Sequence, residues 1–258
     1  MKLNVEVISY IWCMKNLIWI LILLPIFSYS QTGKINIRDG ESCSYNIHYG
    51  FFSGGYAKYS VDKKDKEITV VLEGKTNSMI DVFFKIRDRY ESIVNISSRL
   101  PRYFKRDIIE GSDEIHQEYF FNQETNKVNT QKGSYDCVKK SQDMLSSFIY
   151  GRSLSSKELK SKEPFYINMF LDEENYMMEV KYLATEVINS KIGKIRCIKL
   201  QPKVQIGRVF SNEDDLIIWV SDDKNHILIK LEMGILVGSL EVDIQTAKNI
   251  KYPLSITD

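Results

Sequence analysis

Histidine and cysteine are scarce in this chain, with three His and four Cys among 258 residues. The histidines are His48, His116 and His226, and none stands at the short spacing that aims two imidazoles at one metal ion. The cysteines show no zinc-ligand spacing either. We therefore expect no metal site, and we interpret each histidine as a hydrogen-bonded side chain at the surface or at a strand end.

The sequence also lacks the Gly-x-Ser-x-Gly elbow of many hydrolases and any glycine loop that leads into a helix. Gly54 and Gly55 are adjacent, but they join two apolar stretches and no helix follows them. Two acidic pairs, Asp214-Asp215 and Asp222-Asp223, flank a strand-like run. Neighbouring residues of an extended chain point to opposite faces, so we interpret both pairs as turn acids. The sequence predicts no catalytic residue and no cofactor.

Neither sign of charge dominates, because 35 Lys and Arg stand against 34 Asp and Glu. The two signs are interspersed along the chain. A nucleic-acid-binding face needs a concentration of basic residues, since it must neutralise phosphates. We expect no nucleic acid partner.

The first 30 residues have the pattern of a secretory signal peptide. Lys15 follows Met14, an apolar run occupies positions 17–27, and the small residues Ser28 and Ser30 precede Gln31. The apolar run is too short to span a bilayer comfortably. We interpret residues 1–13 as an extension upstream of the true start. We expect cleavage between Ser30 and Gln31, export to the periplasm or the medium, and no transmembrane segment in the mature chain.

Three cysteines, Cys43, Cys137 and Cys197, follow the predicted cleavage site. An oxidising compartment permits one disulfide with one thiol left over, and the sequence does not say which two residues would pair. Each cysteine lies among apolar residues. Buried free thiols are therefore the favoured interpretation, and a single disulfide is the alternative.

Period-two alternation of apolar and polar residues is the main structural pattern of residues 31–258, which we predict to form a single β-rich domain. It is clearest over 176–182 and 227–233. Turn-forming clusters separate the runs at the spacing of β-hairpins. The other expected strands cover residues 44–49, 56–61, 68–72, 82–90, 115–121, 195–200, 216–220 and 237–244.

Only residues 141–152 have the apolar spacing of a helix, with Ser141 as the expected N-cap. Arg152 at its end is expected to pair with Asp143 or with an acid of the sheet. One short helix cannot supply the crossovers of a parallel sheet, and about a dozen antiparallel strands tend to curl. We predict a mainly β fold, a strongly curved antiparallel sheet or half-open β-barrel with the helix at its open side or mouth.

Several short motifs occur in one order over most of the chain. They are Gly40-Glu41, Tyr45 to Gly50, Gly55-x-Ala57, Asp88 to Ser92, Pro101 to Phe104, Glu110-Gly111, Asp143 to Phe148 with Arg152, Gly193 to Pro202, and Trp219 to Asn225. Together they resemble the domain of unknown function 3108, a family of bacterial exported and envelope proteins. The resemblance implies no reaction, cofactor or catalytic residue. The predicted curved sheet is similar in shape alone to the half-barrels of periplasmic lipoprotein carriers.

The chain has 15 Tyr, 12 Phe and 8 Met, and a curved sheet that carries such side chains inside suits an apolar ligand. We therefore expect a monomeric, non-enzymatic envelope protein that binds a lipid or another apolar or amphiphilic small molecule. The first alternative is a structural or assembly protein that contacts another envelope protein. The second is a hydrolase of envelope polymers with a carboxylate site that only the fold assembles.

Overall fold

The computed structural model describes residues 35–204, 212–234 and 239–258. The predicted signal peptide and its cleavage site at Ser30 and Gln31 lie outside these residues. Within them the chain forms one antiparallel sheet of 14 strands in the order β8-β7-β6-β5-β4-β3-β2-β1-β14-β13-β12-β11-β10-β9. The strands are β1 Ser42–Tyr49, β2 Phe52–Lys64, β3 Glu67–Thr76, β4 Ile86–Asn95, β5 Pro101–Glu110, β6 Asp113–Asn122, β7 Lys127–Thr130, β8 Gly133–Asp136, β9 Phe165–Leu171, β10 Glu174–Ser190, β11 Gly193–Pro202, β12 Leu216–Ser221, β13 Leu228–Gly234 and β14 Ser239–Lys248.

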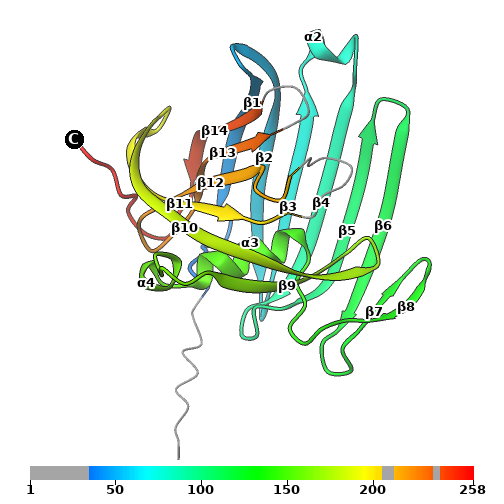
Figure 1. The fold of residues 1–258 in the computed structure, drawn as a ribbon. Coiled ribbons are helices and arrows are strands. Elements are labelled where there is room, and N and C mark those ends of the chain that lie inside the picture. The colour runs from blue at the N-terminus through cyan, green and yellow to red at the C-terminus, as the bar shows by residue number, and fades with distance from the viewer. Residues whose placement is uncertain (1–34, 205–211, 235–238) are drawn as a thin grey trace, which may run out of the picture. The chain divides into compact units, whose positions relative to one another are not determined.

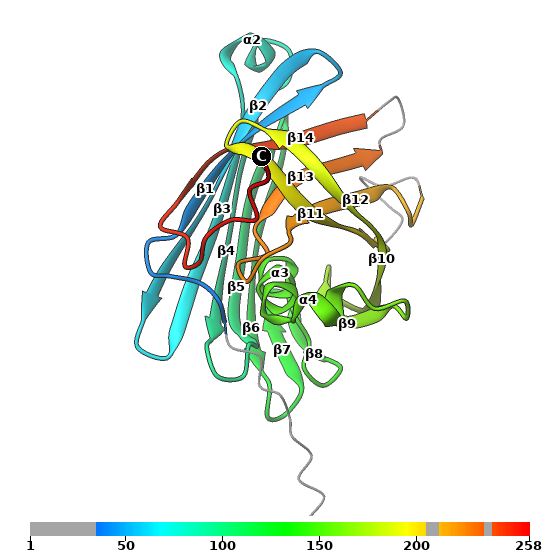
Figure 2. The same cartoon turned by 90° about the vertical axis from the view of Figure 1, so that its left-hand side faces the viewer.

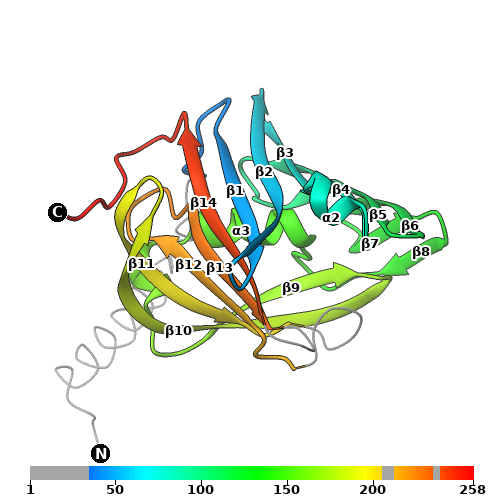
Figure 3. The same ribbon diagram turned by 90° about the horizontal axis from the view of Figure 1, so that it is seen from above.

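Nearly every strand pairs with its neighbour in sequence, and the pairing of β1 with β14 joins the two ends of the series. The sheet curves strongly around the helix α3 (Met144–Ser153), which lies on its concave side (Figures 1 and 3). The predicted mainly β, curved antiparallel sheet is confirmed. The sheet is not closed, because β8 and β9 are its two edges. A half-open barrel is therefore the correct description.

Hydrogen bonds outside the strand ladder bridge the two edges of the sheet. Gln142, in the segment after β8, donates its backbone N–H to Asn168 O (2.8 Å) and accepts from Phe170 N (2.9 Å) in β9. The β9–β10 turn reaches β6, the third strand from the other edge, where Asp172 N donates to Tyr119 Oη (3.0 Å). These bonds hold the β9–β10 hairpin across the gap between β8 and β9, which are not paired as strands.

Two further helices of one turn each are present in the described residues, α2 (Ser78–Asp81) and α4 (Ser156–Leu159). The expected strand 82–90 is wrong at its start. The Asn77 side chain accepts hydrogen bonds from Met79 N and Ile80 N, which favours a helical turn, and β4 begins only at Ile86. No described helix has the length and hydropathy needed to cross a membrane.

The N-cap of α3 is Asp143, and the expectation of Ser141 is wrong. The Asp143 carboxylate accepts from Leu145 N (2.8 Å) and Ser146 N (2.9 Å), and Ser146 Oγ accepts from Asp143 N in return. Ser92 of β4 donates to the other carboxylate oxygen (2.7 Å). A fully buried carboxylate therefore starts the helix and attaches it to the sheet.

Arg152 fixes the other end of α3 through a buried ion pair. Its guanidinium donates to both carboxylate oxygens of Glu41, at 2.5 and 3.2 Å, and to Tyr59 Oη in β2 (3.0 Å). Its Nε donates to the carbonyl oxygen of Asn225, between β12 and β13 (2.8 Å). Of the two expected partners, Asp143 is therefore wrong, and an acid of the sheet is close to correct, because Glu41 accepts a backbone hydrogen bond from Val61 of β2 (2.9 Å). The actual partner directly precedes β1.

The first prediction concerns this ion pair. Glu41→Gln keeps the volume of the side chain but leaves the buried Arg152 charge without a counter-charge. We expect the free energy of unfolding to fall by about 3–5 kcal/mol. Arg102 and Glu67 form the matched control, because they make the same two-bond pair on the exposed side of the sheet. Glu67→Gln should cost less than about 1 kcal/mol in urea unfolding. Equal losses in the two variants would contradict this prediction.

The second prediction concerns Asp143. Burial of its carboxyl group raises its pKa from 3.8 to about 6. The folded state then holds the proton more tightly than the unfolded state between these two values. This carboxyl should therefore make the protein more stable as pH falls from 7 towards 4, by up to about 3 kcal/mol. Asp143→Asn keeps an N-cap acceptor but does not titrate. Urea unfolding of the variant should lack this pH-dependent gain relative to the parent, and an identical pH dependence would contradict the assignment.

Candidate ligand-binding cavity

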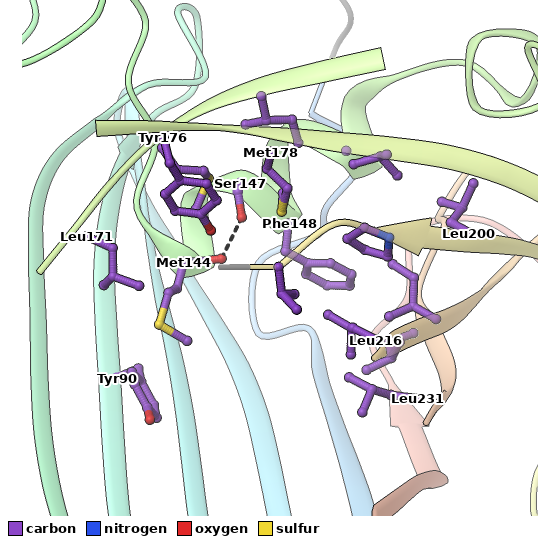
Figure 4. A pocket seen from close by; sticks show the side chains of 18 of the residues that line it. Tyr90, Met144, Ser147, Phe148, Leu171, Tyr176, Met178, Leu200, Leu216 and Leu231 are labelled. Carbon is purple, nitrogen blue, oxygen red and sulfur yellow. Dashed lines mark hydrogen bonds between the residues drawn. The ribbon is translucent and has the colours of Figure 1, made fainter. Parts of the chain in front are cut away.

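A cavity of about 830 Å³ occupies the concave side of the sheet, between α3, the β9–β10 hairpin and strands β4–β6 and β11–β13. Figure 4 shows Leu171 and Tyr90 on one side of it and Leu216 and Leu231 on the other. Most of the lining is aliphatic, aromatic or methionine side chains. They are Tyr90, Ile108, Ile115, Met144, Phe148, Leu159, Phe165, Ile167, Met169, Leu171, Tyr176, Met178, Val180, Leu200, Pro202, Val204, Leu216, Ile218, Val220, Leu228 and Leu231.

The alternation of each strand decides which of its residues reach the cavity. In β10, Tyr176, Met178 and Val180 face inward, whereas Met177 between them is 62% exposed on the outer face. Several inward side chains, Leu216 and Ile218 among them, are only half-buried although they face the inside of the sheet. Apolar side chains at these positions thus line open space and not a filled core.

Polar groups gather at the side of the cavity formed by β5, β6 and the β9–β10 turn. Arg106 Nε donates to Gln117 Oε1 (2.5 Å), and the Arg106 guanidinium also pairs with Asp172. Tyr119 Oη donates to the same Gln117 oxygen (3.3 Å), and burial raises the pKa of Tyr119 to about 12. Arg106 and Asp172 line the cavity and give this side of it a polar surface, and the buried Gln117 and Tyr119 behind them complete the hydrogen-bond network.

A second group of polar side chains lies where α3 meets β12 and β13. His226 is buried, and its Nε2 lies 3.1 Å from Ser156 Oγ. Burial lowers the pKa of His226, so its imidazole is neutral at neutral pH. Ser147 donates its hydroxyl to Met144 O (2.8 Å), the bond drawn in Figure 4. The Ser147 bond lies within one turn of α3, whereas the His226 contact joins residues 70 positions apart in the sequence.

Comparison with protein families identifies the family of this chain. Residues 44–245 match the family described as protein of unknown function (DUF3108). The chain belongs to this family. No curated protein matches the chain.

Among solved structures, this DUF3108 chain is similar to a beta-barrel-like protein of the domain of unknown function DUF1849 from Brucella abortus. The two share 12% sequence identity, with a TM-score of 0.55, over 86% of this chain and 100% of the other. At this identity the likeness concerns the fold alone. It supports the barrel-like architecture and carries no residue role.

The acidic pairs singled out in the DUF3108 sequence do not line the cavity. Asp222 pairs with Lys160 (2.7 Å) and Arg196 (3.0 Å). Asp223 accepts from Asn225 N (2.8 Å), and Asp215 accepts from Asn212 N. These carboxylates therefore organise turns. The carboxylates that do line the cavity are Glu110, Asp172 and Glu174, which sequence reasoning did not select.

The three histidines lie apart, and only His226 lines the cavity. His116 is exposed and contacts Asp107. His48 Nε2 lies 2.6 Å from Asp243. One imidazole nitrogen of His48 and one carboxylate oxygen each of Glu241 and Asp243 lie within 4.8 Å of one another, close enough to bind one metal ion. Desolvation lowers the pKa of His48, but its bonds to Asp243 and Gly50 O outweigh this and raise it. Glu241 already pairs with Lys230 (2.8 Å), so this group is an ion-pair network from β1, β13 and β14.

Cys43, Cys137 and Cys197 are all free and buried. Burial raises the pKa of Cys43 to about 11 and that of Cys197 to about 12, so both thiols stay protonated at neutral pH. The favoured interpretation of buried free thiols agrees with this structure. None of the three cysteines lines the cavity.

One signal in the sequence would have found the polar side of the cavity. Within β5, Phe104, Arg106 and Ile108 share the inward face of an alternating strand, and Arg106 is nevertheless a charged residue. It is only 8% exposed. A charged residue at an inward position requires a buried partner, and this is the pattern that marks the site.

Proposed function

We propose that this protein is an exported, non-enzymatic binding protein that holds one apolar or amphiphilic small molecule, such as a lipid, in the cavity of its curved sheet. The observation that carries the proposal is the cavity of about 830 Å³ with its mainly apolar lining. Ligand sites are typically about 300–1,000 Å³, mostly apolar, with a few placed polar groups.

The size of the cavity supports a ligand site over a packing defect. Protein interiors contain few voids larger than a water molecule, because unfilled apolar space forfeits dispersion contacts. Here Phe148 from α3 and Ile218 and Leu231 from the sheet face the same space and stay half-buried. A ligand of small-molecule size would bury these side chains and recover the contacts.

The distribution of polar groups favours an amphiphile over a plain hydrocarbon. Arg106 comes from β5, and Asp172 and Glu174 come from the β9–β10 hairpin. Leu216 and Leu231 come from β12 and β13, and Figure 4 shows them across the cavity from Leu171, the residue before Asp172. An amphiphile that binds with its polar end towards Arg106 would place its apolar part against β12 and β13. This arrangement matches each part of the ligand to a surface of its own polarity.

Export is the part of the proposal that rests on the sequence. Residues 1–30 carry the signal-peptide pattern, and residues 35–248 contain the whole sheet. Removal of the first 30 residues would therefore leave every described strand intact.

Native mass spectrometry of the protein purified from the cells that make it tests both parts. We expect the measured mass to equal that of residues 31–258 plus one bound small molecule per chain. Lipid extraction would then identify this molecule. A mass that retains residues 1–30 would contradict export. A bare protein that also fails to take up fatty acids or phospholipids added to it would contradict the binding function.

The third prediction compares two neighbouring methionines. Met178→Trp fills the cavity with a larger side chain and should raise the Kd for a fluorescent fatty acid by about tenfold or more. Met177→Trp is the matched control, because it makes the same change one residue away on the exposed face. It should change the Kd by less than about twofold, since it touches no ligand.

Thermal unfolding of both variants checks that the sheet is intact. Two folded variants with the parent Kd would show that the fatty acid binds elsewhere. Equal weakening in both would show that the effect does not depend on the cavity.

A further inference from the structure

Six apolar side chains are exposed together at one end of the strands, and we call them the apolar rim. They are Phe51 and Phe52 of the β1–β2 turn and Met79, Val82, Phe83 and Phe84 of α2 and the segment after it. Phe51 is 104% exposed and Phe83 is 85% exposed. Isolated exposed apolar residues are ordinary, but a contiguous group of this size marks an interaction surface.

Hydrogen bonds hold the two parts of the rim together. Asn77 donates its backbone N–H to Gly54 O (3.0 Å) and its side-chain amide to Ser53 O (2.5 Å). The same side chain accepts the N-cap bonds of α2. The β1–β2 turn and α2 therefore present their side chains as one unit at the end of the sheet opposite α3 and α4 (Figures 1 and 2).

The rim adjoins the β5–β6 turn, which borders the cavity. The Phe84 ring packs against Gly111, whose φ is +63°, and a Cβ at this position would lie only 2.7 Å from that ring, so both features require glycine. Gly111 N also donates to Lys85 O (2.8 Å). The preceding residue, Glu110, lines the cavity, and none of the six rim side chains does. The rim is thus a separate surface beside the proposed binding site.

The charges around the rim are balanced. Asp81 of α2 is neutralised by Arg87 through two hydrogen bonds, at 3.0 and 2.5 Å. Lys75 lies near the end of β3, and Lys85 directly follows Phe84. Asp113 and Glu114 are exposed at the neighbouring β5–β6 turn. Such a surface does not depend on a strongly charged partner.

We propose that the apolar rim inserts into the surface of a lipid bilayer and docks the protein there. Its side chains are exposed at the β1–β2 turn and at α2, beyond the ends of the strands, where they can reach a bilayer surface. Aromatic side chains are favoured at the membrane–water interface. The inference rests in part on the proposed function, because a water-insoluble ligand of the cavity would come from a bilayer.

The fourth prediction uses flotation of the protein with phosphatidylcholine vesicles and with vesicles that also contain phosphatidylglycerol. We expect binding to both, little changed by high salt because the local charges are balanced. The double variant Phe51→Ser, Phe83→Ser should weaken binding by about tenfold or more for each side chain removed. Met177→Ser with Val187→Ser is the matched control, since both residues are exposed and apolar on β10, away from the rim.

The binding of a soluble fluorescent fatty acid separates this inference from the proposed function. The rim variant should keep the parent Kd, whereas Met178→Trp should lose fatty acid binding and still float with vesicles. A parent protein that binds the fatty acid but neither type of vesicle would overturn the membrane docking and leave the cavity function standing. A parent dimer that the rim substitutions convert to a monomer would also overturn it, because the rim would then be an interface between two copies.

Discussion

The buried ion pair between Arg152 and Glu41 is the constraint on which the interior of this protein depends. It joins the end of α3 to the segment before β1, and the same guanidinium also contacts β2 and the β12–β13 turn. A buried pair of this kind adds little net stability compared with apolar residues of the same volume. Its effect is positional, because a shift of α3 away from Glu41 would leave two buried charges unpaired. It fixes α3 on the concave side, and α3 forms one wall of the cavity.

The second constraint is the open edge of the sheet. A closed barrel of antiparallel strands satisfies all its edges, whereas this sheet ends at β8 and β9. The segment after β8 and the β9–β10 turn supply hydrogen bonds across that gap, and Lys132 adds an ion pair to Glu173 (2.7 Å). The closure is therefore made by a hairpin that also lines the cavity. The hydrogen bonds and ion pairs that close the gap explain why Arg106 and Asp172 lie at this side of a largely apolar cavity.

Much of the fold was predictable, because alternation in a strand is a local pattern. The face formed by Tyr176, Met178 and Val180 was identified from spacing alone and does line the cavity. Strands β5, β7, β8 and β9 were missed, since β7 and β8 have four residues each and β5 carries charges on its inward face. The partner of Arg152 was not predictable, because Glu41 lies 111 residues away in sequence and only the fold brings the two together. The spacing of residues in the sequence shows which face of a strand a side chain lies on. It does not show which distant residue that side chain contacts.

The cavity lining and the apolar rim both leave apolar side chains without a full covering of protein atoms. Apolar side chains that stay in contact with water or open space in a folded chain are unfavourable, and many apolar side chains of this sheet pack into buried clusters. The cavity lining and the apolar rim are two places where less buried apolar side chains gather, and Glu110, Gly111 and Phe84 connect them through the β5–β6 turn. A ligand would cover the first surface, and a bilayer would cover the second. Under the proposed function, a protein that collects a lipid from a membrane meets the bilayer first and the ligand second, so one amphiphilic phase would account for two surfaces that would otherwise need separate partners.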